Sequence, residues 1–197
     1  MYELIILSHL VRRPSHGYLI AKIINDIIGP YAKISNGRFY PLLAKLEHEG
    51  YIETHSEPTQ EQRGDRHSHQ YTITTKGRQR QHQLMLDTTS NPGEYSKLFF
   101  QKAFSLDLLQ VEERLYLIDH YINYCQAHIL HLRAEQEDIL QNGLDYGLKS
   151  VLIASISNAQ QHLRQQWQLE LDWAVELRLQ ATSASDQAAS LPEFSKN

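Results

Sequence analysis

The stretch Ser35 to Gly50, SNGRFYPLLAKLEHEG, predicts a helix whose two faces differ in character. An apolar stripe with the spacing i, i+3, i+4, i+7 runs along one face: Phe39, Leu42, Leu43 and Leu46. The first turns instead carry a glycine, an arginine, a tyrosine and then Pro41, which cannot donate a backbone hydrogen bond. The pattern therefore predicts a helix with a well-packed inner face and a small, loosely bonded beginning.

Two further helices are expected before this one. The first covers residues 2–11, with apolar residues on one face, and Arg12, Arg13 and Pro14 end it. Ser15 stands where an N-cap would, and the second helix follows with isoleucines at helical spacing: Ile20, Ile23, Ile24 and Ile27. Gly29-Pro30 ends it, and Ser35 or Asn36 caps the third helix.

A β-hairpin is expected after the third helix. Residues 51–55 and 70–74 alternate in a strand-favouring pattern, and the polar stretch between them contains Pro58 and Gly64. A further helix begins near Lys76 and runs to about Leu86. Three short helices and a hairpin with a long loop are typical of a winged helix-turn-helix.

The second half of the chain predicts long helices. Apolar residues at an a/d heptad spacing run through the first of them: Leu115, Ile118, Ile122, Cys125, Ile129 and Leu132. After a break at 141–147, a second helix of about 148–179 carries Leu163, Trp167, Trp173 and Leu177. We expect these ten residues to form a dimerisation interface. Cys125 is most simply a small core residue, with a redox-switch role as the alternative.

The sequence thus predicts a mostly α-helical protein of two domains. An α+β winged helix-turn-helix DNA-binding domain is expected at residues 1–87 and a long-helix dimerisation domain at 88–180, because residues 87–93, DTTSNPG, read as a linker. Residues 181–197, rich in Ala and Ser, are expected to be a disordered tail.

Composition and charge set further limits. The single cysteine excludes an intramolecular disulfide, and the N-terminal apolar run lacks the features of a signal peptide, so we expect a soluble cytoplasmic protein. Residues 1–87 hold 11 Lys and Arg against 9 Asp and Glu, a net +2, whereas residues 88–197 hold 8 against 14, a net −6. This asymmetry is a weak sign that the halves have different roles.

The outward face of the third helix suits contact with DNA. Gly37, Pro41 and Ala44 are small and would allow the backbone to approach a major groove, with Lys45 and His48 on the same face. On the flank, Arg38 could reach guanine O6 and N7, while Asn36 could pair with adenine or a phosphate. The alternative is an ordinary surface helix with one polar side.

Two other polar groups could each have a functional role or none. Arg63, Gly64 and Arg66 stand near the tip of the hairpin, where an arginine could enter a minor groove, or where the tip could simply be solvated. His67 and His69 could bind a metal, but no third ligand is apparent, so we expect no metal and no cofactor. The aromatic side chains of the second half could line an effector pocket or build the helical core.

Three segments resemble the winged-helix domain of PadR-type transcriptional regulators: HGYLIAKII from His16, SNGRFYPLLAKLEHEGYIE from Ser35 and RGDRHSHQYTITTKGR from Arg63. The resemblance covers nearly all of residues 2–80, and the second half is similar to the longer-tailed subgroup of phenolic acid decarboxylase repressors. It implies a homodimer on an inverted-repeat operator, usually a repressor, sometimes released by a small aromatic effector. Tyr18 and Tyr40 would contact phosphates. Arg38 departs from the threonine of many members.

We therefore expect a homodimeric, sequence-specific DNA-binding regulator that does not bind a membrane. Its expected partners are a second copy of the chain, double-stranded operator DNA and a small aromatic effector. The predicted DNA-contacting residues are His16, Tyr18, Lys22, Ser35, Asn36, Gly37, Arg38, Tyr40, Lys45, Arg63, Gly64 and Arg66. The alternative is a winged helix used for protein–protein contact without DNA. Catalytic motifs are absent from the sequence, so no enzyme is expected.

Overall fold

The computed structural model describes residues 2–30, 33–55 and 69–189, and the chain divides into two units, residues 1–108 and 109–197. The predicted domain boundary after residue 87 thus differs from this division, which groups residues 88–108 with the first unit. Each unit has its own core and is described by itself.

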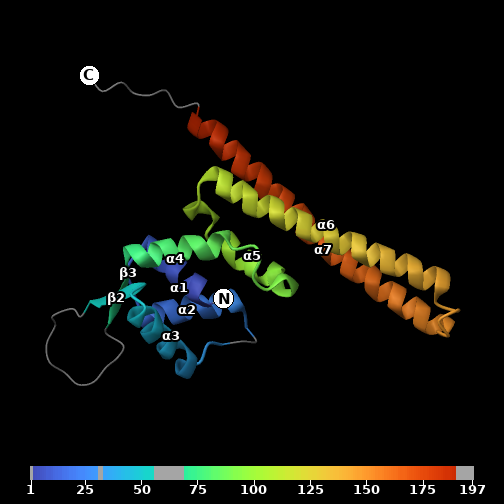
Figure 1. The fold of residues 1–197 in the computed structure, drawn as a ribbon, viewed down its shortest axis with the longest axis horizontal. Coiled ribbons are helices and arrows are strands. Elements are labelled where there is room, and N and C mark those ends of the chain that lie inside the picture. Colours follow the sequence, from blue (N-terminus) through green and yellow to red (C-terminus); the bar gives the residue numbers. More distant parts are fainter. Residues whose placement is uncertain (1, 31–32, 56–68, 190–197) are drawn as a thin grey trace. The chain divides into compact units, whose positions relative to one another are not determined.

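The first unit begins with the helices of the expected helix-turn-helix (Figure 1). They are α1 (Tyr2–Arg12), α2 (Gly17–Ile28) and α3 (Asn36–His48). Ser15 is not the N-cap of α2, as the sequence had suggested, because it lies in the short strand β1 (Ser15–His16), and His16 holds the cap position. The Ser15 hydroxyl is instead hydrogen-bonded to His9 Nε2 at 2.6 Å.

The predicted hairpin strands are confirmed as β2 (Ile52–His55) and β3 (Gln70–Ile73). They pair antiparallel with Ile52 opposite Ile73, and β1 adds to the other edge of β3 with Ser15 opposite Tyr71. The order is β1-β3-β2, so β3 is the central strand of this sheet. The two-residue β1 was missed because nothing in its sequence alternates.

The core of the first unit lies between α1, α2, α3 and the sheet. Phe39, Leu43 and Leu46 of the predicted α3 stripe are each 1% exposed, and they pack with side chains of the neighbouring elements: Ile5, Ile6, Leu7, Leu10, Ile20, Ile24, Ile34, Ile52 and Tyr71. α1 is buried on more sides than its predicted stripe, since Ile5 and Ile6 are buried as well. This helix therefore forms the centre of the unit.

The rest of the first unit covers α1. Helix α4 (Thr75–Leu86) is joined to it by the Arg80–Glu3 ion pair, with Nε to Oε1 at 2.7 Å, and by a hydrogen bond from Gln81 to Ser8 at 3.2 Å. The 3₁₀ turn η1 (Pro92–Glu94), helix α5 (Tyr95–Ala103) and a second 3₁₀ turn, η2 (Leu106–Leu108), complete the unit.

The second unit is a helical hairpin of α6 (Val111–Asn142) and α7 (Ser150–Ala189). The two helices run antiparallel, because Asp119 binds Arg178 at one end while Gln136 binds Ser157 nearer the turn. Helix α7 ends at Ala189, within the segment from residue 181 for which a disordered tail is expected, and residues 190–197 lie outside the described part of the chain.

Among the helices of the described segments, none is both long and apolar enough to cross a membrane.

Candidate nucleic-acid interface

Helix α3 presents the face that the sequence assigned to DNA. Gly37, Pro41 and Ala44 are exposed, and a methyl group added at Gly37 would meet nothing within 4 Å. Pro41 lies inside the helix and removes the amide that would otherwise bond the carbonyl of Gly37. The first turns of α3 therefore have an open surface. They also have one backbone acceptor, the Gly37 carbonyl, that receives no hydrogen bond from residue 41.

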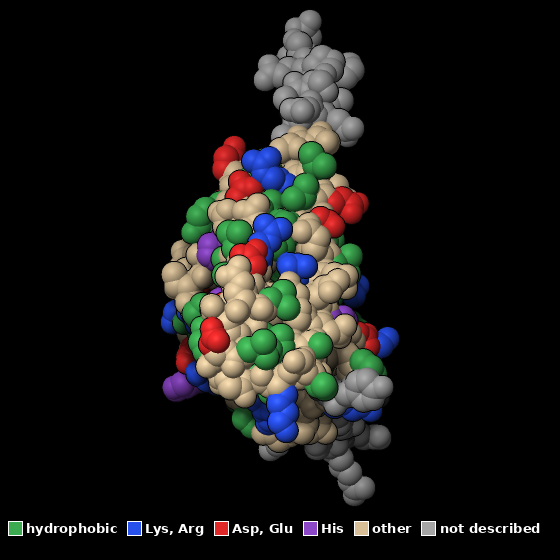
Figure 2. Space-filling view, turned by 90° about the vertical axis from the view of Figure 1, so that its right-hand side faces the viewer, with side chains coloured by type: hydrophobic (Ala, Val, Ile, Leu, Met, Phe, Trp, Pro, Cys, Tyr) green, Lys and Arg blue, Asp and Glu red, His purple; other side chains and the backbone are tan. Residues whose placement is uncertain are grey.

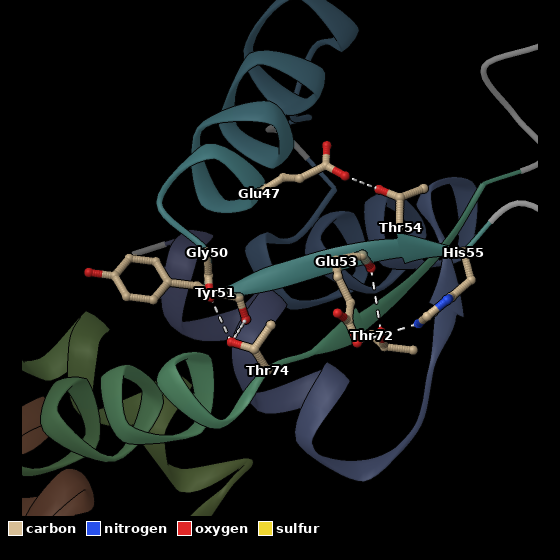
Figure 3. A network of polar contacts seen from close by, with 8 residues as sticks. All are labelled: Glu47, Gly50, Tyr51, Glu53, Thr54, His55, Thr72 and Thr74. Atoms are coloured by element: carbon tan, nitrogen blue, oxygen red, sulfur yellow. Dashed lines mark hydrogen bonds and ion pairs between the residues drawn. The ribbon is translucent and has the colours of Figure 1, made fainter.

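The end of α3 is fixed by backbone geometry and by one threonine. Gly50 has φ +73°, the left-handed conformation that glycine tolerates, and the amide of Tyr51 bonds the carbonyl of Leu46 at 2.9 Å. The Thr74 hydroxyl then donates to the Gly50 carbonyl at 2.7 Å, as Figure 3 shows. The orientation of α3 against the sheet therefore depends on this turn.

Thr74 also begins α4, three residues before Gly77. Its hydroxyl accepts a hydrogen bond from the amide of Gly77 at 3.0 Å. A β-carbon on Gly77 would lie 2.0 Å from the carbonyl oxygen of Tyr51. Only glycine lets α4 pack this closely on the turn that follows α3.

A second contact ties α3 to the hairpin. The Thr54 hydroxyl of β2 donates to the Glu47 carboxylate near the end of α3 (Figure 3). On the hairpin itself, Glu53 accepts from the Thr72 hydroxyl at 3.3 Å and lies 3.4 Å from His55 Nε2. These acidic side chains were not among the predicted site residues, although Glu47 stands one turn after the outward-facing Ala44.

A groove runs beside α3, and the sequence analysis did not predict it. It is lined by residues of α3 and by two residues of the hairpin: Tyr40, Pro41, Ala44, Glu47, His69 and Tyr71. Burial, followed by the charge of Glu47, raises the pKa of Tyr71 above its ordinary value, so its phenol stays protonated. No spacing rule could have joined these residues, because β3 reaches α3 only through the folded sheet.

Two predicted residues of α2 lie on one flank of that helix. Tyr18 is 62% exposed, its ring stacked on that of His16 with centroids 6.0 Å apart, and Lys22 is exposed one turn later. The Nδ1 atom of His16 is buried and has no hydrogen-bond partner among the described residues. His16, Tyr18 and Lys22 therefore lie close to one another at the start of α2.

The predicted cations of α3 are less free than expected. The guanidinium of Arg38 lies over the Tyr2 ring, 5.7 Å from its centroid, on the flank of α3 rather than on the middle of its outward face. Lys45 forms an i,i+4 ion pair with Glu49 at 3.7 Å. Ser35, at the N-cap position, and Asn36 are exposed, so the start of α3 remains open to an anion.

The predicted hairpin-tip residues, Arg63, Gly64 and Arg66, lie outside the described residues, as does His67 of the weighed histidine pair. Within the described segments, no group of three or more His, Cys, Asp or Glu side chains could hold a metal ion.

The predicted dimerisation residues divide into two groups in the helical hairpin. Ile118 and Cys125 are fully buried within the chain, and burial raises the pKa of the Cys125 thiol to about 12. Leu163 is 43% exposed, and the others are partly buried: Leu115, Ile122, Ile129, Leu132, Trp167, Trp173 and Leu177. Much of the heptad pattern therefore serves contacts inside the chain.

Polar and aromatic contacts between α6 and α7 were not predicted. The Tyr121 hydroxyl donates to Glu170 at 2.7 Å, which together with burial raises the pKa of Tyr121. The rings of His128 and Trp167 stack almost parallel, 4.1 Å apart.

Figure 2 shows one face on which acidic, basic and apolar side chains are interspersed. Exposed apolar residues of the helical hairpin include Leu130, Leu144, Val151 and Leu169.

Comparison with known proteins gives a family match in the first unit. The model described as transcriptional regulator PadR-like family matches residues 6–83. No curated protein matches the chain.

Several solved structures are similar. A transcriptional regulator from Clostridium thermocellum is 29% identical, with 42% of this chain and 74% of that chain covered and a TM-score of 0.35. Bacillus subtilis PadR in complex with operator DNA is 19% identical over 87% of this chain and 98% of its own, with a TM-score of 0.40. The same protein in complex with p-coumaric acid is 18% identical over 87% of this chain and 97% of its own, with a TM-score of 0.39.

Proposed function

We propose, from the match of residues 6–83 to the model of the PadR-like family of transcriptional regulators, that this chain is a sequence-specific DNA-binding regulator. It acts as a homodimer on an inverted-repeat operator and represses transcription. Catalysis forms no part of this proposal.

The observation that carries the proposal is the exposed first half of α3. Gly37, Pro41 and Ala44 offer no side chain that would hold a DNA groove away from the helix. In a helix-turn-helix, the N-terminal residues of this helix contact base edges, and its free amides attract phosphate. We assign base contacts to Asn36 and Arg38 at this end of the helix.

Phosphate contacts are assigned to the flank of α2 and to the side chains around α3. Tyr18 and Lys22 are exposed on α2, and Ser35, Tyr40 and Lys45 surround the start and outer side of α3. His16 stacks on Tyr18 and holds its ring in place. Phosphate contacts position the protein but carry no sequence information, so these residues set affinity rather than specificity.

The homodimer is assigned to the helical hairpin. The exposed Leu163 and the partly buried heptad residues offer apolar area to a second copy, whereas Ile118 and Cys125 act inside the chain. Two tethered DNA-binding units gain affinity from a high effective concentration at paired half-sites. A small aromatic effector, which the sequence resemblance implies, would release the DNA only if it binds better to a dimer geometry that does not fit the operator.

The proposal is tested by fluorescence anisotropy of labelled DNA from the upstream region of the protein's own gene. A random duplex of equal length is the control, and each titration is made at two salt concentrations. We expect tight binding that prefers the upstream DNA and weakens steeply with salt, because phosphate contacts release counterions. Equal weak binding to both duplexes would contradict sequence specificity. No binding even at low salt would favour the protein-interaction alternative.

A further inference from the structure

A cavity of about 240 Å³, partly open to solvent, lies in the first unit between α1, α2 and the end of α5. Its apolar wall is formed by Ile5 of α1, Ile23 and Ile27 of α2, and Phe104, which directly follows α5. None of these residues belongs to the DNA-contacting set. Because an apolar cavity of about 150 Å³ can hold benzene, this one has room for an aromatic ring and a short polar arm.

The positive groups of the lining are already engaged. The Arg12 guanidinium lies 2.5 Å from the Asp107 carboxylate and donates to the Phe104 carbonyl at 3.0 Å. Burial, reinforced by Arg13 and Arg12, lowers the pKa of His9, so its imidazole is neutral at pH 7. An anionic ligand would therefore meet no free positive charge in this cavity.

The negative and acceptor groups of the lining are, by contrast, available. Asp26 lines the cavity from α2, is exposed, and has no ion pair within the described segments. The side chain of Gln101 is buried, with the residue 7% exposed, and its amide oxygen accepts no hydrogen bond from the residues that the structure describes. A buried acceptor without a donor is costly, so a donor entering the cavity would relieve that cost.

We propose that this cavity binds a small primary amine with an apolar body about the size of one aromatic ring. The apolar body lies against Ile23, Ile27 and Phe104. The ammonium group pairs with Asp26 and donates a hydrogen bond to the Gln101 amide oxygen. Shape and charge together thus select a cation over a neutral or anionic molecule of the same size.

The cavity is connected to the predicted DNA-contacting side by one short path. His9 lines the cavity and is hydrogen-bonded to Ser15, which pairs with Tyr71 in the central strand of the sheet. Helix α2 also carries Tyr18 and Lys22 of the predicted interface, and Lys22 lies one turn before Asp26. An effect of the amine on DNA binding rests on the proposed function, whereas occupation of the cavity does not.

The site is tested by isothermal titration calorimetry of the full chain with benzylamine, benzyl alcohol and benzoate at pH 7. The three probes share one ring and differ in charge. We expect benzylamine to bind about tenfold more tightly than benzyl alcohol, or about 1.4 kcal/mol, and benzoate to bind more weakly than both. Chemical-shift mapping by NMR should place the changes at Ser8, Gln101 and Ser105.

Two matched variants test whether the charge of Asp26 causes the preference for benzylamine. Asp26→Asn should reduce benzylamine binding to the level of benzyl alcohol and leave benzyl alcohol unchanged. Asp145→Asn, which removes an exposed carboxylate of the other unit, should change neither. Equal affinity for the three probes, preference for benzoate, or absence of saturable binding would overturn the amine site. If DNA binding fails while benzylamine still binds, the proposed function falls and the site stands.

Discussion

The two units of this protein obtain their order in different ways. In the first unit, single residues make specific contacts between elements. Gly77 packs closely on the Tyr51 carbonyl, and the Thr74 hydroxyl donates a hydrogen bond to the Gly50 carbonyl. In the hairpin of α6 and α7, side chains of similar kind recur along two helices, and polar pairs such as Gln136 and Ser157 alternate with apolar ones. Stability is therefore concentrated at a few positions in one unit and spread along the other.

This difference predicts how far the loss of stability caused by a mutation should spread in each unit. A site in the first unit couples elements distant in the sequence, so one change should loosen α3, the hairpin strands and α4 together. A site in the helical hairpin has equivalent neighbours one heptad away, so one change should be absorbed locally. Four predictions follow from this contrast, ordered from the largest expected effect to the smallest.

Gly77→Ala should destabilise the first unit by about 4 kcal/mol, because its β-carbon would overlap a backbone oxygen that cannot move without displacing the turn after α3. Urea denaturation followed by circular dichroism measures the loss. Gly37→Ala is the matched control, since its β-carbon would meet nothing within 4 Å, and it should be neutral or stabilising. Similar stabilities of the two variants would contradict the contrast.

Leu43→Ala should cost about 3 kcal/mol in the unfolding free energy, because Leu43 is fully buried in the shared core of α1, α2 and α3. Leu163→Ala, in the more exposed position on α7, should cost less than about 1 kcal/mol in the isolated chain. Measuring both at several protein concentrations sharpens the comparison. A concentration-dependent loss at Leu163 would support its place in a dimer interface.

Lys102 should make the stability of the first unit depend on alkaline pH. It is fully buried, donates to the Asp87 carbonyl and lies 5.6 Å from the Tyr95 ring centroid, and burial lowers its pKa to about 8. The unfolded chain then binds more protons between pH 8 and 10.5, so stability should rise with pH there, by on the order of 2 kcal/mol.

Lys102→Met should remove this rise, and denaturation curves of both proteins from pH 7 to 10.5 measure the difference. Subtracting one pH profile from the other cancels the tyrosines that titrate in the same range. Identical profiles would show that Lys102 is not the group that responds.

Arg38→Ala should weaken operator binding by about 1–3 kcal/mol and relax base preference at one position. Lys22→Ala should weaken binding to all duplexes alike, because a phosphate contact carries no sequence information. Anisotropy with the preferred duplex and its single-base variants measures both effects. A uniform loss in both variants would mean that Arg38, which lies over Tyr2, does not contact a base.

Sequence pattern was enough to predict α1 to α4, α6, α7 and the two hairpin strands, whereas α5 was not predicted. The stripe of Phe39, Leu43 and Leu46 packs inward as expected, and β2 and β3 lie within a residue of their predicted bounds. It could not predict β1, since a two-residue strand has no period, nor the continuation of α7 to Ala189 through a segment rich in Ala and Ser.

Part of the candidate site could also be predicted. Exposure of Gly37, Pro41 and Ala44 on one face follows from helical spacing alone. The groove between α3 and β3, the engagement of Lys45 by Glu49 and the position of Arg38 over Tyr2 could not. Each joins side chains through a neighbouring element or a rotamer that spacing does not determine.

The sequence by itself determined which elements form and which faces of them are apolar, because backbone propensity and hydrophobic period are local properties. Only the tertiary structure decided that Ile118 and Cys125 are used inside the chain and that Asp26 and Gln101 meet at one cavity. Those outcomes depend on packing between segments far apart in the sequence, and the free energy of that packing is not local.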